Sequence, residues 1–245
     1  MGAFGLKKGY AWLCYWAAVF VLACSPWERE IPAGGGAVVE IPSEPPLVAI
    51  TFDDGPHIAN TRRLLDGLAA REIPATFFLV GERLAGNEAL VREMDAAGHQ
   101  IGVHTWDHIM LDEKVTPQEF VRQMTQTRQA LEHILGEGEY WLRPPYGIMT
   151  AELQRMEEGP LIIWSVDPED WKDRDKARIV DYVLTRVQDG DIILMHDMFD
   201  ASVDAALEIC DALTQRGFCF VTVEELMQTR GVTPEAGRRY NRILP

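Results

Sequence analysis

The sequence contains few cysteines and has no cluster of basic residues. Its 23 lysines and arginines stand against 38 aspartates and glutamates, which gives a formal net charge of −15 at pH 7. Nucleic acids and anionic membrane surfaces are bound by basic clusters, so neither is predicted as a partner. Among the four cysteines, Cys210 and Cys219 flank a predicted helix-to-strand turn, and their spacing resembles no zinc-binding pattern. These two could form a disulfide, or they could be buried as small apolar side chains.

The sequence also lacks an apolar run of comfortable membrane-spanning length near its N-terminus. The stretch from Tyr10 to Ala23 is too short for such a span, and it follows Lys7 and Lys8. A basic start followed by an apolar core of this length predicts a signal peptide over residues 1–23. The run ends at Cys24 in a sequence that resembles a bacterial lipobox. A lipidated N-terminus, an ordinary signal peptide and an uncleaved anchor therefore all stay open, and each of them predicts an exported domain, held at the cell membrane or cell wall or secreted.

Residues 25–46 combine five prolines with three consecutive glycines and show no helical periodicity. This composition predicts a flexible tether. Residues 47–230 have the length of one ordinary domain with a substantial core, and residues 231–245 are predicted to form a C-terminal tail. No internal repeat is present, and the oligomeric state is left open.

Predicted strands and helices alternate from Leu47 onward. The first strand is apolar and β-branched throughout, which predicts burial on both of its faces. Alternation of this kind predicts an α/β fold in which parallel strands form a closed or nearly closed barrel with helices outside. The predicted strands cover residues 47–52, 74–80, 100–104, 140–143, 161–167, 191–196 and 218–223. The predicted helices cover residues 61–71, 87–97, 116–135, 150–158, 176–187 and 201–215.

Two adjacent carboxylates, Asp53 and Asp54, stand where the first strand ends. Neighbouring strand residues point to opposite faces, so both acids can serve one site only if the backbone leaves the strand there. Gly55 and Pro56 predict such a turn. Taken alone, the segment is better explained as an ordinary turn that favours Asp and Gly.

Polar or aromatic residues follow five of the predicted strands. Each group alone has an ordinary explanation, such as an acidic turn, a solvated helix face, a strand end, a capped loop or a hydrogen-bonded histidine. In a barrel of parallel strands, however, the active site is built at the carboxyl ends of the strands, where all five groups fall. We therefore predict that they form one site. The groups are Asp53–Asp54, His104–His108, Arg143–Gly147, Asp167–Trp171 and His196.

The same five groups resemble the motifs of the polysaccharide deacetylases, the NodB-homology domain of the family-4 carbohydrate esterases. The resemblance covers about residues 47–228 and implies a distorted (β/α) barrel of about seven parallel strands. It also implies an enzyme that hydrolyses acetyl amides. The matching segments are Thr51–Gly55, His104–His108, Arg143–Tyr146, Asp167–Trp171 and Leu194–His196.

By this resemblance, Asp54, His104 and His108 bind one divalent metal ion, zinc above all, with cobalt or another divalent ion as alternatives. Two imidazoles and one carboxylate leave a coordination position open, as catalytic zinc sites do and structural ones do not. The family pattern makes Asp53 the catalytic base, and it places Arg143 so that an ion pair orients this base.

The resemblance also supplies the acid side of the reaction. It assigns His196 as the general acid and Asp170 as the residue that orients it and raises its pKa. It places the oxyanion-stabilising N–H at Tyr146, whose side chain would also line the sugar groove. Trp171 and Leu194 would form the pocket for the acetyl methyl group.

Three functions follow as hypotheses. The first is removal of acetyl groups from N-acetylhexosamine residues of an extracellular polysaccharide, with peptidoglycan favoured because a tethered, exported enzyme would face the cell wall. The second is the same chemistry on chitin-type oligomers or O-acetyl xylan. The third is a non-catalytic glycan-binding module, which the presence of every expected ligand, base and acid disfavours.

Overall fold

A computed structural model describes residues 44–244 of the chain. The expected signal peptide and all of the expected tether up to residue 43 lie outside this range. Residues 45–245 are assigned to one compact unit. Within the described range, no helix is both long and apolar enough to cross a membrane.

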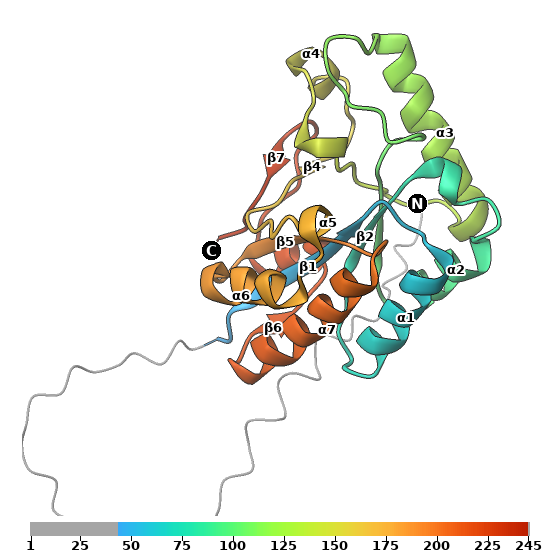
Figure 1. Ribbon diagram of the computed structural model, residues 1–245. Helices are drawn as coiled ribbons and strands as arrows, with labels where there is room; N and C mark the ends of the chain where they lie inside the picture. The colour runs from blue at the N-terminus through green and yellow to red at the C-terminus, as the bar shows by residue number, and fades with distance from the viewer. Residues whose placement is uncertain (1–43, 245) are drawn as a thin grey trace, which may run out of the picture. The chain divides into compact units, whose positions relative to one another are not determined.

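The centre of the unit is a parallel sheet in the strand order β3-β2-β1-β5, with β6 paired to the start of β1 (Figure 1). Strand β1 is therefore flanked on both sides, and its last residue, Asp53, is in register with Phe78 on one side and His196 on the other. The strands are β1 (Leu47–Asp53), β2 (Thr76–Leu79), β3 (Gln100–Val103), β5 (Asp191–His196) and β6 (Cys219–Phe220).

Between β3 and β5, isolated parallel bridges continue the strand pairing around the barrel. Val103 pairs with Leu142, Leu142 pairs with Leu161, and Val166 pairs with Ile193. The predicted strands at 140–143 and 161–167 thus occupy the expected places in the barrel, but within them only Leu161–Ile162 forms a regular strand, β4. The prediction of a parallel α/β fold with outer helices is confirmed, and the irregular half accounts for the distortion of the barrel.

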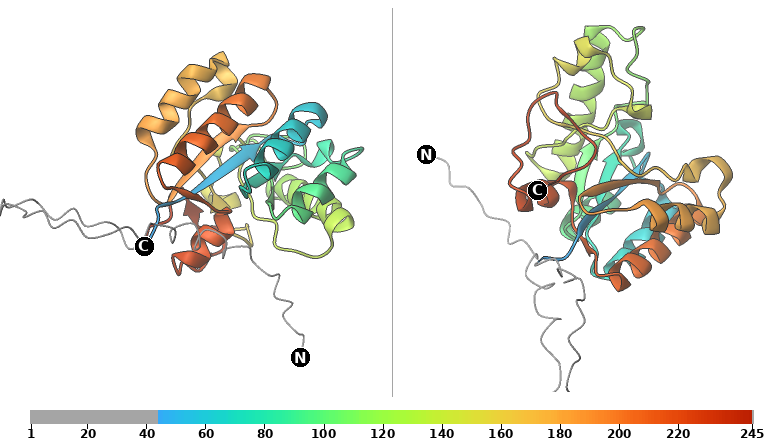
Figure 2. Two further views of the ribbon diagram at one scale, coloured as in Figure 1. Left: turned by 90° about the horizontal axis from the view of Figure 1, so that it is seen from below. Right: turned by 90° about the vertical axis from the view of Figure 1, so that its left-hand side faces the viewer.

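Helices cover the outside of the sheet, and α1, α7 and α6 lie side by side along it (Figure 2, left). Helix α3 begins as its sequence predicts, because Thr116 accepts a hydrogen bond from the Glu119 backbone at 3.2 Å and Pro117 occupies the first turn. The helices are α1 (Ile58–Ala69), α2 (Glu88–Ala96), α3 (Pro117–Leu135), α4 (Ala151–Gln154), α5 (Asp170–Asp173), α6 (Lys176–Arg186), α7 (Asp200–Gln215) and α8 (Val223–Thr229), with 3-10 turns at Gly81–Arg83 and Pro145–Gly147.

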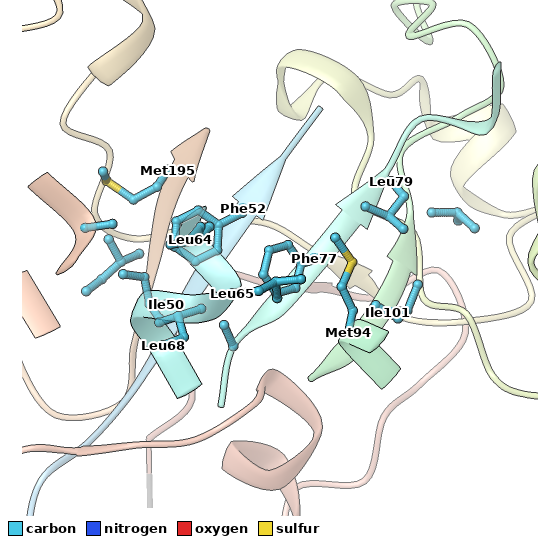
Figure 3. Close-up of a cluster of buried hydrophobic side chains, with 14 of the residues drawn as sticks. Ile50, Phe52, Leu64, Leu65, Leu68, Phe77, Leu79, Met94, Ile101 and Met195 are labelled. Carbon is cyan, nitrogen blue, oxygen red and sulfur yellow. The ribbon is translucent and has the colours of Figure 1, made fainter. Parts of the chain in front are cut away.

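Strand β1 is buried along its whole length, as its apolar sequence predicts. Alternate residues serve two clusters: Ile50 and Phe52 pack outward under α1 and α2, whereas Ala49 belongs to an inner cluster with Phe78 and Trp141. Figure 3 shows the outer cluster, in which helix side chains meet those of the sheet. This packing on both faces fixes the register of β1, and hence the position of the carboxylates at its end.

The prediction of a C-terminal tail after residue 230 is wrong. Strand β7 (Arg239–Tyr240) pairs with β4, and both Tyr240 and Ile243 are buried in the inner cluster. The backbone N–H of Ile243 also donates to the carbonyl of Gly190 at 2.8 Å. These two apolar side chains hold the segment against the barrel. No disulfide joins Cys210 to Cys219 in the part of the chain that the structure describes, so that alternative is not realised.

Candidate active site

The turn after β1 presents two carboxylates to one side of the molecule. Asp53 ends the strand and is buried, while Asp54 adopts a left-handed backbone conformation with φ of 70°. A non-glycine residue in this region costs about 1–3 kcal/mol and persists only when its surroundings impose it. The backbone thus leaves the strand between the two acids, which brings both carboxylates to the end of the barrel.

Asp54, His104 and His108 converge on one point. The Asp54 Oδ1 atom lies 3.4 Å from His104 Nε2 and 3.0 Å from His108 Nε2, and the three ligand atoms are all within 4.8 Å of one another. A tetrahedral ion with bonds of about 2.0–2.1 Å would hold its ligand atoms roughly 3.3 Å apart. The spacing of the cluster therefore fits a zinc-sized ion.

Hydrogen bonding fixes which atoms face this point. His104 Nδ1 lies 2.7 Å from the carbonyl oxygen of Arg143, so Nδ1 carries the proton and Nε2 presents a lone pair to the cluster. Among the described residues, Asp54 Oδ1 is a buried atom without a hydrogen-bond partner. Burial raises the pKa of Asp54, but His104 and His108 outweigh that effect and hold the pKa of this carboxyl well below its usual range. Lone pairs that converge in this way form a binding site for a cation.

Arg143 is completely buried beneath Asp53. Its Nη1 donates to Asp53 Oδ1 at 2.7 Å and to Thr51 Oγ1 at 2.6 Å, and its guanidinium lies 4.1 Å from the centre of the Phe78 ring. Two further N–H groups donate to the carbonyls of Ile162 and Ile163. Burial lowers the pKa of Arg143, while the charge of Asp53 raises it. The base expected from the sequence is thus held at one oxygen by a cation that is itself fixed on several sides.

His196 ends β5 opposite Asp53 and is bound to Asp170. The Nδ1 atom lies 2.7 Å from Asp170 Oδ1, so the other ring nitrogen is directed away from this partner. Burial lowers the pKa of His196, but the hydrogen bond and charge of Asp170 raise it more, and the pKa reaches about 9. The hydrogen bond and charge of Asp170 therefore favour the protonated imidazole, as a general acid requires.

The three remaining expected residues lie in different environments. Tyr146 has a positive φ of 59°, its ring centre lies 4.9 Å from that of His108, and 57% of the residue is exposed. Trp171 follows Asp170 and is 50% exposed. Leu194 is buried on the same face of β5 as His196. The roles predicted for these residues stay predictions.

Two further polar residues have structural partners. His99 is buried, accepts a hydrogen bond from the Ala75 backbone at 3.0 Å, and has a pKa lowered to about 4 by burial. Asp167 accepts a hydrogen bond from the Glu169 backbone at 2.8 Å, which orders its loop.

Sequence reasoning missed two residues that touch the turn after β1. Arg83 donates to the backbone carbonyl of Asp54, and the buried carboxyl of Asp197 lies against Gly55. For Asp197 a signal was available, because it is an acid directly after a buried strand and beside the predicted general acid.

The fold and the site together define a parallel α/β barrel with a candidate catalytic metal centre at the carboxyl ends of its strands. A family model described as polysaccharide deacetylase matches residues 40–158. The peptidoglycan-N-acetylmuramic acid deacetylase PdaC of Bacillus subtilis (strain 168) is 39% identical over 184 residues, which cover 75% of this chain and 39% of that protein. This chain thus spans well under half of that relative's length.

Two further comparisons cover more of the matched protein. A peptidoglycan-N-acetylglucosamine deacetylase of Bacillus cereus is 37% identical over 189 residues, which cover 74% of this chain and 68% of that protein. The structure of a family 4 acetyl xylan esterase from Clostridium thermocellum in complex with a cobalt ion superposes with a TM-score of 0.77 at 30% identity, covering 81% of this chain and 100% of that one. The chain therefore belongs to the polysaccharide deacetylase family.

Proposed function

We propose that this chain is a metal-dependent hydrolase that removes acetyl groups from N-acetylhexosamine residues of an extracellular polysaccharide, and that this polysaccharide is peptidoglycan. The observation that carries the proposal is the meeting of three units at the ends of neighbouring strands. These units are the Asp54, His104 and His108 cluster, the Asp53–Arg143 pair and the Asp170–His196 pair.

A divalent ion held by the cluster, which we propose is zinc, would polarise the acetyl carbonyl and lower the pKa of a bound water to about 7. The protein contributes the base. Asp53 Oδ1 is engaged by Arg143, whereas Oδ2 points toward the cluster and lies 3.7 Å from His104 Nε2. Oδ2 is therefore the oxygen that takes the proton from the attacking water, and the ion pair with Arg143 holds this carboxylate in its orientation.

His196 contributes the proton that the departing sugar amine needs. Because Asp170 holds Nδ1, the proton available to the substrate is on Nε2. We assign the backbone N–H of Tyr146 to the oxyanion of the tetrahedral intermediate, and its exposed ring to the sugar groove. Trp171 and Leu194 are assigned to the acetyl methyl pocket.

The choice of peptidoglycan rests on two supports. The relatives from Bacillus subtilis and Bacillus cereus are named for acetylated peptidoglycan sugars. The sequence of residues 1–46 predicts an exported, tethered protein, which would meet the cell wall first. We also propose that the protein is attached to the membrane only through its N-terminal segment.

A second candidate substrate class is O-acetyl xylan, which the similarity to the acetyl xylan esterase favours. Chitin-type oligomers offer the same N-acetylhexosamine unit as peptidoglycan. A binding module without catalysis has less support, because the base, the acid and three metal ligands are all in place.

Mass spectrometry of acetylated glycans separates these candidates. The zinc-loaded protein is incubated with peptidoglycan fragments, chitin oligomers and acetyl xylan in parallel reactions. We expect peptidoglycan fragments to lose the mass of one or more acetyl groups. Loss from acetyl xylan alone would replace the proposed substrate, and loss from no glycan would contradict the proposed activity.

A further inference from the structure

Asp197 is a buried carboxyl that the proposed reaction does not use. It follows His196 directly and is fully buried. A Cβ atom built on Gly55 would lie 2.9 Å and 3.1 Å from the two carboxylate oxygens of Asp197, closer than real side chains pack. The carboxyl therefore lies directly against the backbone of the turn that carries Asp53 and Asp54. A side chain at position 55 would therefore force the turn or the Asp197 carboxyl to shift.

A chain of hydrogen bonds connects Asp197 to the end of the same turn. The backbone N–H of His57 donates to Thr61 Oγ1 at 2.7 Å. The hydroxyl of Thr61 has a single proton, and it donates this proton to Asp197 Oδ2. Both Thr61 and Asp197 are fully buried, so these bonds are shielded from water. The turn after β1 is thus bound at Gly55 and His57 to the residue that follows β5.

Two exposed or half-buried side chains strengthen the same connection. Asn60 Nδ2 donates to the Met198 carbonyl at 2.8 Å. Arg83 donates to the Asp54 carbonyl and also lies 3.0 Å from Met198 Sδ. The segment that presents a metal ligand and the segment that follows the general acid are therefore joined at several points.

A buried carboxyl in this position is unfavourable by itself. Burial raises the pKa of Asp197 to about 7, although the hydrogen bond from Thr61 opposes the rise. Among the described residues, its Oδ1 atom has no hydrogen-bond partner. An apolar side chain would avoid this cost. The advantage of aspartate over an apolar residue at this position therefore lies in the contacts of its carboxyl with the turn.

We propose that Asp197 is a positioning residue, which acts through Thr61 and Gly55 to hold Asp54 in its ligating conformation at a fixed place relative to His196. Aspartate tolerates the left-handed conformation better than most residues, but this conformation is still costly for Asp54 and persists only when its surroundings support it. The inference rests on the proposed function, since it assumes that Asp54 binds the catalytic metal. The proposal makes metal affinity depend on Asp197, a residue that is neither a metal ligand nor the base or acid.

The test is a matched pair of substitutions at Thr61, with zinc affinity measured by competition with a chelator. Thr61→Val keeps the shape of the side chain but removes the hydroxyl, and Thr61→Ser keeps the hydroxyl. Groups that orient metal ligands typically contribute about 10–100-fold to affinity, so we expect Thr61→Val to weaken zinc binding by about 10-fold or more. Thr61→Ser should bind zinc nearly as tightly as the wild type. Equal zinc affinity in all three folded proteins would overturn the proposal.

A double-mutant cycle tests the contact with Gly55. Gly55→Ala should weaken zinc binding in the wild-type background, because the added methyl group displaces the turn from the Asp197 carboxyl. In an Asp197→Ala background, Gly55→Ala should reduce zinc affinity by a clearly smaller factor. Equal losses in both backgrounds would contradict the role of Asp197. If Asp197→Ala does not fold, the Thr61 pair decides the question.

The thermal unfolding of the metal-free variants separates positioning from general stability. A merely structural Thr61 would lower the unfolding temperature and leave the zinc affinity of the folded protein unchanged, which would overturn the proposal. Zinc competition also gives a result whether or not any glycan is deacetylated. Failure of the proposed function and failure of this inference are therefore separate outcomes.

Discussion

Asp170 binds His196 at two points, with Oδ1 2.7 Å from the ring Nδ1 and Oδ2 accepting the backbone N–H at 2.9 Å. One carboxylate thus fixes both the tautomer of the imidazole and the position of the strand end that carries it. Asp170 itself is fully buried in the first turn of α5. The orientation of the proposed acid is therefore built into the fold before any substrate arrives.

This pair predicts a pH dependence of stability. The pKa of His196 is raised from 6.5 to about 9 in the folded protein. A pKa that folding raises means that the protonated form stabilises the native state. The contribution is complete below about pH 6.5, declines as the pH rises, and is lost above about pH 9. A shift of this size corresponds to about 3 kcal/mol.

Urea unfolding of the metal-free protein at pH 6 and pH 9.5 measures this effect. We expect the free energy of unfolding to fall between these values in the wild type and to change much less in Asp170→Asn, which lacks the charge that raises the pKa. The same pH dependence in both proteins would show that Asp170 does not control the protonation of His196.

Replacement of His196 by Ala should separate amide from ester hydrolysis. An alkoxide leaves an ester more readily than an amide anion leaves an N-acetyl group, so protonation matters more for the amide. We expect a loss of about 10²-fold or more in N-deacetylation, the usual contribution of a positioned acid, and a much smaller loss with an activated aryl acetate. Asp170→Asn should fall between wild type and His196→Ala. Equal losses on both substrates would assign His196 a different role.

Removal of either histidine from the cluster should remove the metal. Three protein ligands hold the ion, and His104→Ala or His108→Ala leaves two, which is too few for tight binding. Metal analysis of the purified variants measures the stoichiometry directly. His133→Ala is the matched control, because His133 is exposed in the last turn of α3. Unchanged metal content in both cluster variants would exclude this site.

The adjacent carboxylates should respond differently to the same substitution. Asp53→Asn removes the base but keeps an oxygen that can accept from Arg143, so turnover should be abolished while the metal remains. Asp54→Asn removes a charged ligand, so both metal content and turnover should fall. If Asp53→Asn loses the metal instead, the roles of the two residues are exchanged.

The sequence predicts the regular half of the barrel well because that half consists of continuous apolar runs. Strand β5 (Asp191–His196) has the predicted bounds, and β1 is longer than predicted by only its final residue, Asp53. Polar groups at the ends of such strands could be assigned to one site, since parallel strands present their carboxyl ends to the same face. The structure places the predicted ligands, base and acid on that face.

The irregular half depends on contacts between distant residues, which local sequence does not encode. The bridges at Leu142 and Val166 are single pairs within otherwise irregular chain. Strand β7 has two residues and is held in place by its pairing with β4, which lies far away in the sequence. Helix α8 (Val223–Thr229) is short and begins at Thr222 with a capping box, a signal that the prediction of a strand through residue 223 overlooked.

Release of acetate from peptidoglycan fragments tests the central claim most directly. The protein is assayed as loaded with zinc, after removal of the metal with a chelator, and after zinc is restored, with Asp53→Asn measured alongside. We predict release by the zinc-loaded protein, loss of release on chelation, recovery when zinc is added back, and no release by Asp53→Asn in its zinc-loaded form. Release that continues in the metal-free protein and in Asp53→Asn would contradict a metal-dependent deacetylase that uses Asp53 as its base.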